Sequence, residues 1–281
     1  MLKSIIISNG VSSIDLMHND DLTLMSIEGV SPESQINTSS LSGYDGSTVV
    51  SSNVPMRQIS ILLRFFEGDA EIAKHSLYSI FPIRKNIELY YVSDLGIKVI
   101  NCLTEKVDIP PNDYPLSAQI SLICPSPYFT DLEPKSKIMS AVTPLFKFPF
   151  TFNGPFKFGE RMASVIENFV NDSTVDVYPI IEFKAISALT NPSIMNINTY
   201  EKMKVNVSLA AGEKLRIDTR IGKKSITKIS GSEETNCFNC MTDDFKFFKL
   251  YTGDNYLKYD ADTNAAGLQT TVQWENLYGG V

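Results

Sequence analysis

Two cysteines separated by two residues, Cys237 and Cys240, have the spacing at which a pair of thiolates binds one metal ion. A structural zinc site needs about four ligands, so a second pair of ligands is required. The sequence offers two further cysteines, Cys102 and Cys124, which are scattered along the chain, and two histidines. We therefore expect the cysteines to pack as small apolar residues, without a metal site, a disulfide framework or a cofactor.

Nucleophilic catalysis requires a base beside the nucleophile, and neither histidine lies in such a context. His18 lies in a polar turn, and His75 is expected on the surface of a helix. The nucleophile-elbow, P-loop and dinucleotide-binding motifs are absent from the sequence. Adjacent carboxylates such as Asp243-Asp244 are typical of solvated turns. We predict no catalytic residue and a protein that is not an enzyme; a glycosidase or a metal-dependent hydrolase stays open as an alternative.

Aromatic residues are abundant, with 16 Phe, 12 Tyr and one Trp, and most occur at strand spacing, which predicts that they form the core. Trp274, near the C-terminus, is the best single candidate for a surface platform that stacks on a sugar ring. This residue keeps a carbohydrate-binding module open as an alternative function.

Charge is unevenly distributed along the 281 residues, whose net charge is −7. Residues 1–132 contain 8 Lys/Arg and 15 Asp/Glu, whereas residues 133–281 contain 17 of each. Neither part has the basic excess that phosphate contacts require, so direct nucleic-acid recognition is not expected. No stretch approaches the roughly 20 apolar residues of a membrane span, and the run Ile5-Ile6-Ile7 is too short for a secretion signal. We expect a protein without a membrane partner that is made and kept in a cytoplasm until assembly or lysis.

The dominant periodicity of the sequence is two, which is typical of β-strands. Apolar and polar residues alternate over residues 203–209 and again over residues 214–218, with a Gly212-Glu213 turn between them, and this pattern predicts a β-hairpin. The same alternation predicts further strands over residues 59–65, 87–91, 116–122 and 177–183, and the phenylalanine-rich residues 145–158 are also strand-like.

Residues 69–81 have helical spacing instead, with Asp69 as N-cap and Pro82 after the end. The residues at helical spacing, which we expect on one face, are Ile72, Ala73, Ser76, Leu77, Ile80 and Phe81. Residues 31–53 are rich in Ser, Thr, Gly and Asn, which predicts a long mobile loop. Prolines on both sides of residue 130 predict a domain boundary, giving two domains, residues 1–132 and residues 133–281, of a mainly β protein with one helix.

Several short motifs follow one another in a fixed order along the chain. Those of the first half are Gly43-Tyr-Asp-Gly46, Arg57-Gln-Ile-Ser-Ile61 and Cys124-Pro-Ser-Pro-Tyr-Phe129. Those of the second half include Tyr178–Phe183, Asn191–Ile194, Gly212–Thr219, Phe247–Leu250 and Tyr278–Gly280. In content and order they resemble the distal tail proteins of siphovirus-type phages of Gram-positive hosts or their prophages.

This resemblance implies a split β-barrel belt domain with one helix, followed by a galectin-like β-sandwich. It implies a structural virion protein whose homo-hexameric ring joins the tail tube protein to the tail-associated tip protein and receptor-binding proteins at the tail tip. Interaction residues implied on this basis are Gly43, Asp45, Gly46 and Arg57. A prophage-derived tail-like bacteriocin or a contractile particle would use the same protein class. Because the negative charge lies in the expected ring domain, we expect a ring lumen that repels passing DNA.

Overall fold

The structure, a computed structural model, describes residues 2–43, 45–66, 70–110, 116–139, 142–144, 159–161 and 166–281. The chain forms two compact units, Met1–Leu132 together with Leu277–Val281, and Glu133–Asn276. The sequence places the whole C-terminal segment in the second domain, whereas its last five residues pack with the first unit. The strands predicted over residues 145–158 and the N-cap at Asp69 lie outside the described residues.

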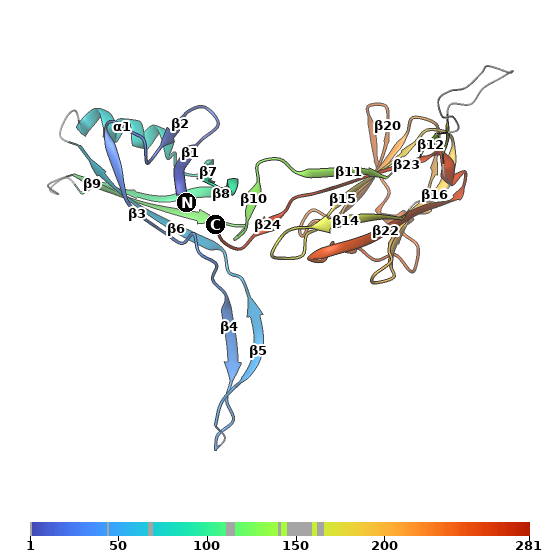
Figure 1. Ribbon diagram of the computed structural model, residues 1–281, viewed down its shortest axis with the longest axis horizontal. Coiled ribbons are helices and arrows are strands. Elements are labelled where there is room, and N and C mark those ends of the chain that lie inside the picture. The colour runs from blue at the N-terminus through green and yellow to red at the C-terminus, as the bar shows by residue number, and fades with distance from the viewer. Residues whose placement is uncertain are drawn as a thin grey trace. The chain divides into compact units, whose positions relative to one another are not determined.

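The first unit is built on one antiparallel sheet (Figure 1). Its strands are, in spatial order, β2 (Ser13–Asp15), β1 (Leu2–Ser8), β7 (Asn86–Ser93), β8 (Gly96–Asp108), β9 (Ser117–Cys124), β6 (Arg57–Phe65) and β3 (Leu22–Glu28). Two short strands, β10 (Phe129–Asp131) and β24 (Leu277–Tyr278), pair with each other, and β10 also pairs with β8. The predicted mainly β fold is confirmed, but the described strands do not close into a barrel, since β2 and β3 remain as the two edges.

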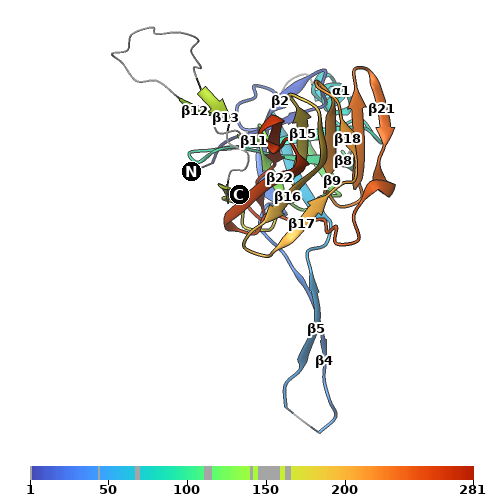
Figure 2. The same ribbon diagram turned by 90° about the vertical axis from the view of Figure 1, so that its right-hand side faces the viewer.

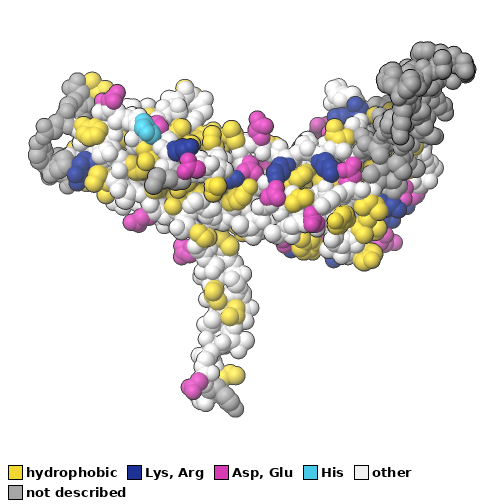
Figure 3. All heavy atoms as spheres, viewed as in Figure 1, with side chains coloured by type: hydrophobic (Ala, Val, Ile, Leu, Met, Phe, Trp, Pro, Cys, Tyr) yellow, Lys and Arg dark blue, Asp and Glu magenta, His cyan; other side chains and the backbone are white. Residues whose placement is uncertain are grey.

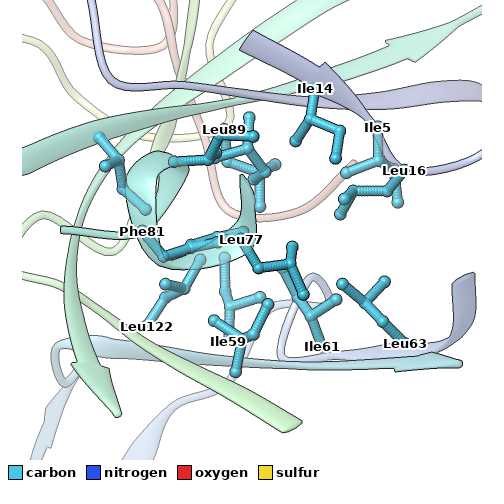
Figure 4. Packing of buried hydrophobic residues seen from close by; sticks show 14 of the residues in the cluster. Ile5, Ile14, Leu16, Ile59, Ile61, Leu63, Leu77, Phe81, Leu89 and Leu122 are labelled. Carbon is cyan, nitrogen blue, oxygen red and sulfur yellow. The ribbon is translucent and has the colours of Figure 1, made fainter. Parts of the chain in front are cut away.

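The helix α1 (Ala70–Ile80) covers one face of this sheet, and apolar residues of both form the core (Figure 4). Ala73, Leu77, Ile80 and Phe81 are buried at helical spacing, as predicted. Ile72 and Ser76 were predicted on the same face but are exposed, Ile72 by 66%, because the buried stripe of this short helix is narrower than the predicted face.

Strand β6 shows how sequence alternation builds the other side of the core. Residues 57, 59, 61, 63 and 65 are all buried, whereas Gln58, Leu62 and Arg64 between them are exposed. Period-two side-chain alternation therefore buries Arg57 on the same face as Ile59 and Ile61.

The second unit consists mainly of two stacked antiparallel sheets (Figure 2). The six-stranded sheet has the order β11 (Lys135–Met139), β23 (Leu268–Trp274), β15 (Ile180–Ala185), β19 (Lys214–Asp218), β20 (Ser225–Ser230) and β21 (Glu233–Asn236). The five-stranded sheet has the order β14 (Ile166–Asn171), β22 (Gly253–Thr263), β16 (Leu189–Asn196) and β17 (Glu201–Lys204), and β18 (Ser208–Leu209) also pairs with β16. The remaining elements are the pair β12 (Val142–Pro144) and β13 (Gly159–Arg161) and the 3-10 turns η1 (Phe238–Cys240) and η2 (Ala265–Gly267).

The hairpin predicted over residues 203–218 is wrong in its pairing. Strand β18 pairs with β16 in one sheet, whereas β19 pairs with β15 and β20 in the other. Gly212, with φ of +90°, is the turn at which the chain passes between the sheets. Alternation identifies a strand with one buried face, but it does not identify the strand's hydrogen-bonded partner.

Candidate assembly site at the root of a hairpin arm

Residues 31–53 do not form the predicted loop. They contain β4 (Gln35–Ser39) and β5 (Thr48–Asn53), which pair with each other and with no other strand of the described chain. We call residues 35–53 the arm; it leaves the sheet between β3 and β6 (Figure 1). Every described residue of the arm is exposed, and hydrophobic side chains are interspersed along it (Figure 3). They are Ile36, Leu41, Val49 and Val50.

The predicted Gly43–Gly46 motif is the tip of this arm. Gly43 and Gly46 have φ of +86° and +94°, a backbone region that residues with a Cβ rarely adopt. Asp45 lies between them and is exposed. The motif therefore makes the reversal between β4 and β5 and presents one carboxylate at the tip.

Residues 29–32, which precede the arm and which we call its root, are held by Arg57. Its Nε donates to the carbonyl of Pro127 at 2.7 Å, and its Nη1 donates to the carbonyls of Gly29 at 2.5 Å and Ser31 at 2.9 Å. Its Nη2 donates to the carbonyl of Gly279. The guanidinium also lies 5.1 Å from the centroid of the Phe129 ring. One side chain thus joins the arm root, the segment after β9 and the C-terminal segment.

Arg57 is only 7% exposed, and no carboxylate among the described residues forms an ion pair with it. Burial lowers the pKa of its guanidinium, but arginine has so high a pKa that it remains charged. Four carbonyl dipoles take the place of the missing anion, which is how a buried cation is tolerated. Arg57 is therefore a positioning residue rather than an exposed contact.

Two glycines make room at this root. A Cβ on Gly29, whose φ is +85°, would lie 1.9 Å from the carbonyl oxygen of Gln58. A Cβ on Gly280 would lie 2.6 Å from Cδ of Pro32. Both positions therefore exclude a side chain. Gly280 of the C-terminal Tyr278-Gly-Gly280 motif packs directly on Pro32, in the root of the arm.

The C-terminal segment is anchored by a second cluster that sequence reasoning missed. Tyr278 pairs with Phe129, and its hydroxyl donates to Asp131 at 3.2 Å. Lys98 forms an ion pair with Asp131 and lies 3.6 Å from the centroid of the Tyr278 ring. Burial lowers the pKa of Lys98, but Asp131 and Tyr278 outweigh it and hold this pKa above its usual value. The motifs at 57, 124–129 and 278–280, far apart in sequence, therefore meet at one place.

The other sequence candidates do not form a reactive site. His18 is exposed and contacts Asp15 at 3.1 Å, and His75 is exposed on α1, as predicted. Cys237 is buried and Cys240 ends η1; burial raises the pKa of Cys237. Within the described ranges no group of three or more metal-ligating side chains is found.

Trp274 does not present the expected surface platform. It is 7% exposed, and its ring packs edge-on against Phe169 of the opposing sheet with centroids 5.7 Å apart. Its position on β23 turns it into the sandwich core, which a tryptophan at strand spacing does when the facing sheet supplies an aromatic partner.

No helix in the described chain is long and apolar enough to cross a membrane.

The chain matches two family models in consecutive order. Residues 11–124 match the phage tail protein RIFT-related domain, and residues 172–278 match the C-terminal domain of the siphovirus-type tail component. The chain belongs to the siphovirus-type distal tail protein family. The resemblance drawn from the motifs is confirmed, and the protein is a structural component of the distal tail and baseplate.

Solved structures agree with this fold. The SPP1 Dit protein, described as a paradigm of the hub adsorption apparatus of phages infecting Gram-positive bacteria, has 12% identity and a TM-score of 0.69, with 98% of this chain and 99% of that chain covered. A chain of the activated phage p2 baseplate with Ca has 11% identity, a TM-score of 0.51 and complete coverage of both chains. The corresponding baseplate structure with Sr gives 10% identity, a TM-score of 0.53 and 99% coverage of both chains. No curated protein sequence matches the chain.

Proposed function

We propose that six copies of this chain form a closed ring at the distal end of a phage tail. The ring joins the tail tube protein to the tail-associated tip protein and carries receptor-binding proteins outside. In this proposal the first unit forms the ring and the second, galectin-like unit lies around it. The particle is a siphovirus or a prophage-derived relative, and the protein assembles in the host cytoplasm before it becomes part of the tail tip.

The arm is the observation that carries this proposal. An isolated two-stranded hairpin is marginally stable in water, because each strand has one partner and no buried face. Here every described arm residue is exposed, and four of the exposed side chains are large and apolar. A surface that covers the arm would supply the missing face, and a second copy of the chain offers such a surface in a ring that closes on itself.

The sheet of the first unit supports the same proposal. Its edge strand β3 pairs only with β6 among the described strands, so one row of its backbone groups is open. Open edges favour pairing with another chain, and a ring satisfies every such edge at once. We infer that the arm tip, with Gly43, Asp45 and Gly46, contacts the neighbouring copy or the tail tube, and that Arg57 fixes the direction of the arm.

The test is the solution mass and the particle shape. Six copies of the 31.3 kDa chain give about 188 kDa by light scattering, with six-fold rings in negative stain, for the chain alone or with the tail tube protein present. Replacing residues 35–53 by Gly-Ser-Gly should leave folded monomers. Val49→Asp with Val50→Asp should weaken the ring, whereas Ser52→Asp on the same strand serves as the matched control. Rings that survive removal of the arm would contradict the proposal.

A further inference from the structure

Strand β21 is an edge strand of the six-stranded sheet (Figure 2). Residues of this edge line a surface pocket of about 290 Å³. We call it the β21 pocket. Its lining consists of Lys224, Ser225, Thr227, Glu234, Asn236 and Phe238. Small-molecule sites typically have volumes of about 300–1,000 Å³, so this pocket suits an occupant at the small end of that range.

Its one aromatic wall is held rigidly. Phe238, 36% exposed, stacks on Phe247 with centroids 6.1 Å apart and an angle of 29° between the rings. Phe245 packs edge-on against Phe247 at 4.9 Å, and Nζ of Lys224 lies 5.1 Å from the Phe247 ring centroid. Two neighbouring rings and a cation thus fix the orientation of Phe238, so little side-chain freedom is lost when a ligand packs on it.

The polar side chains of the pocket are held in place and can still form hydrogen bonds with a ligand. Asn236 is opposite Thr227 in the register of β20 and β21, and both face the pocket. The side-chain oxygen of Asn236 accepts from the backbone N–H of Phe238 at 2.9 Å. This bond fixes the amide, while its nitrogen, a two-proton donor, has no partner among the described residues. Glu234 supplies acceptors and Lys224 supplies donors, so the pocket has no net charge.

An occupant must therefore offer an apolar face to one aromatic ring and several neutral hydroxyl or amide groups around it. A pyranose ring has this chemistry, because its axial C–H groups form an apolar face and its hydroxyls both donate and accept. An anionic ligand would meet Glu234, and a large apolar one would leave the polar side chains unpaired. We propose that the β21 pocket binds one neutral sugar residue of a bacterial surface glycan. This proposal does not depend on ring formation.

A microarray of bacterial surface glycans, probed with the labelled full-length chain, tests it. The wild type should bind a subset of neutral glycans. Phe238→Ala should weaken this binding at least about tenfold, the loss expected when one contact worth about 1.4 kcal/mol is removed. Glu234→Gln, which is conservative and exposed, should also reduce binding and guards against the case in which Phe238→Ala fails to fold. Tyr200→Ala is the matched control, since Tyr200 is a 78% exposed aromatic elsewhere in the second unit.

Near-ultraviolet circular dichroism should show that each variant keeps its tertiary structure, and light scattering should show the wild-type oligomer in all of them. Absence of wild-type binding on the whole array would overturn the proposal. So would binding that Phe238→Ala and Glu234→Gln leave unchanged, or binding lost equally in Tyr200→Ala. A wild type that binds glycans but forms no ring, alone or with the tail tube protein, would refute the ring and leave the glycan site in place.

Discussion

Replacing Arg57 by methionine should destabilise the first unit more than any surface substitution. The change keeps most of the side-chain length but leaves four carbonyls without a donor, those of Gly29, Ser31, Pro127 and Gly279. Hydrogen bonds to a charged group contribute roughly 1.5–3 kcal/mol each, so their simple sum is about 6–12 kcal/mol. That sum is too large, because the variant no longer has to bury a charge and water can reach some of the carbonyls.

We therefore expect a loss of about 3–5 kcal/mol in the free energy of unfolding of the first unit, which corresponds to about two buried carbonyls left without a donor at roughly 1–3 kcal/mol each. For a domain of this size, about 3–5 °C of melting temperature corresponds to 1 kcal/mol, so the transition should move down by about 10–20 °C. Differential scanning calorimetry should show this shift in one transition while that of the second unit stays in place. Arg64→Met, an exposed arginine on the same strand, is the matched control and should change stability by less than about 0.5 kcal/mol.

Deletion of Leu277–Val281 makes this test sharper. The deletion removes the Gly279 carbonyl and the β24 pairing, so it weakens the same junction from the other side. If Arg57 acts through that carbonyl, the double variant should be less destabilised than the sum of the two single effects, by about 1 kcal/mol or more. Additive losses, or a loss below about 1 kcal/mol in Arg57→Met alone, would refute the assignment of Arg57 as the residue that joins these segments.

Three further predictions concern other positions. Gly29→Ala should cost about 2–4 kcal/mol by chemical denaturation because of the clash described above, whereas Gly10→Ala, also at positive φ but with open space around it, should cost about 1 kcal/mol. Burial would raise the pKa of Asp218, but hydrogen bonds from an arginine and a backbone N–H lower it below its usual 3.8. Its carboxylate therefore stabilises the second unit above about pH 4, and this contribution is lost as the pH falls through the folded-state pKa; Asp218→Asn should show a smaller loss of stability between about pH 5 and pH 2, and equal losses would contradict this. Contact with the thiol of Cys124 and burial raise the pKa of the Cys102 thiol. Iodoacetamide should therefore modify the partly exposed Cys240 first and Cys102 only after unfolding, and mass spectrometry of peptides would show this order.

Local periodicity was sufficient for the elements that bury a single face. The alternation of β6 identified both the strand and its buried face, and the spacing of Leu77, Ile80 and Phe81 identified α1. The turn at Gly212 was also identified correctly, but not the sheets on either side of it. Pairing between strands is decided by contacts over long sequence distances, and these leave no local signal.

The assembly site was predictable only in part. Arg57 was selected through a resemblance, but its partners are backbone carbonyls, which any residue type can supply, so sequence offers no means of finding them. Trp274 was wrongly predicted at the surface because a tryptophan side chain suits stacking on a sugar ring. Whether it is exposed depends on the facing sheet, whose Phe169 packs against it. The β21 pocket likewise depends on Asn236 and Phe238 lying beside Lys224, which precedes β20, a proximity that only the fold creates.

The polar composition that made the arm look like a loop has a physical reason. All described residues of the arm are exposed in the single chain, and a continuous apolar hairpin would favour aggregation. Apolar residues such as Val49 and Val50 are instead interspersed among Ser, Thr and Asn. An arm of this kind gains little stability from its own contacts. The clamp at Arg57 compensates by fixing both ends of the arm to the sheet and to the C-terminal segment. Because the direction of the arm is set in the single chain, less conformational entropy would be lost when a neighbouring copy covers it in the proposed ring.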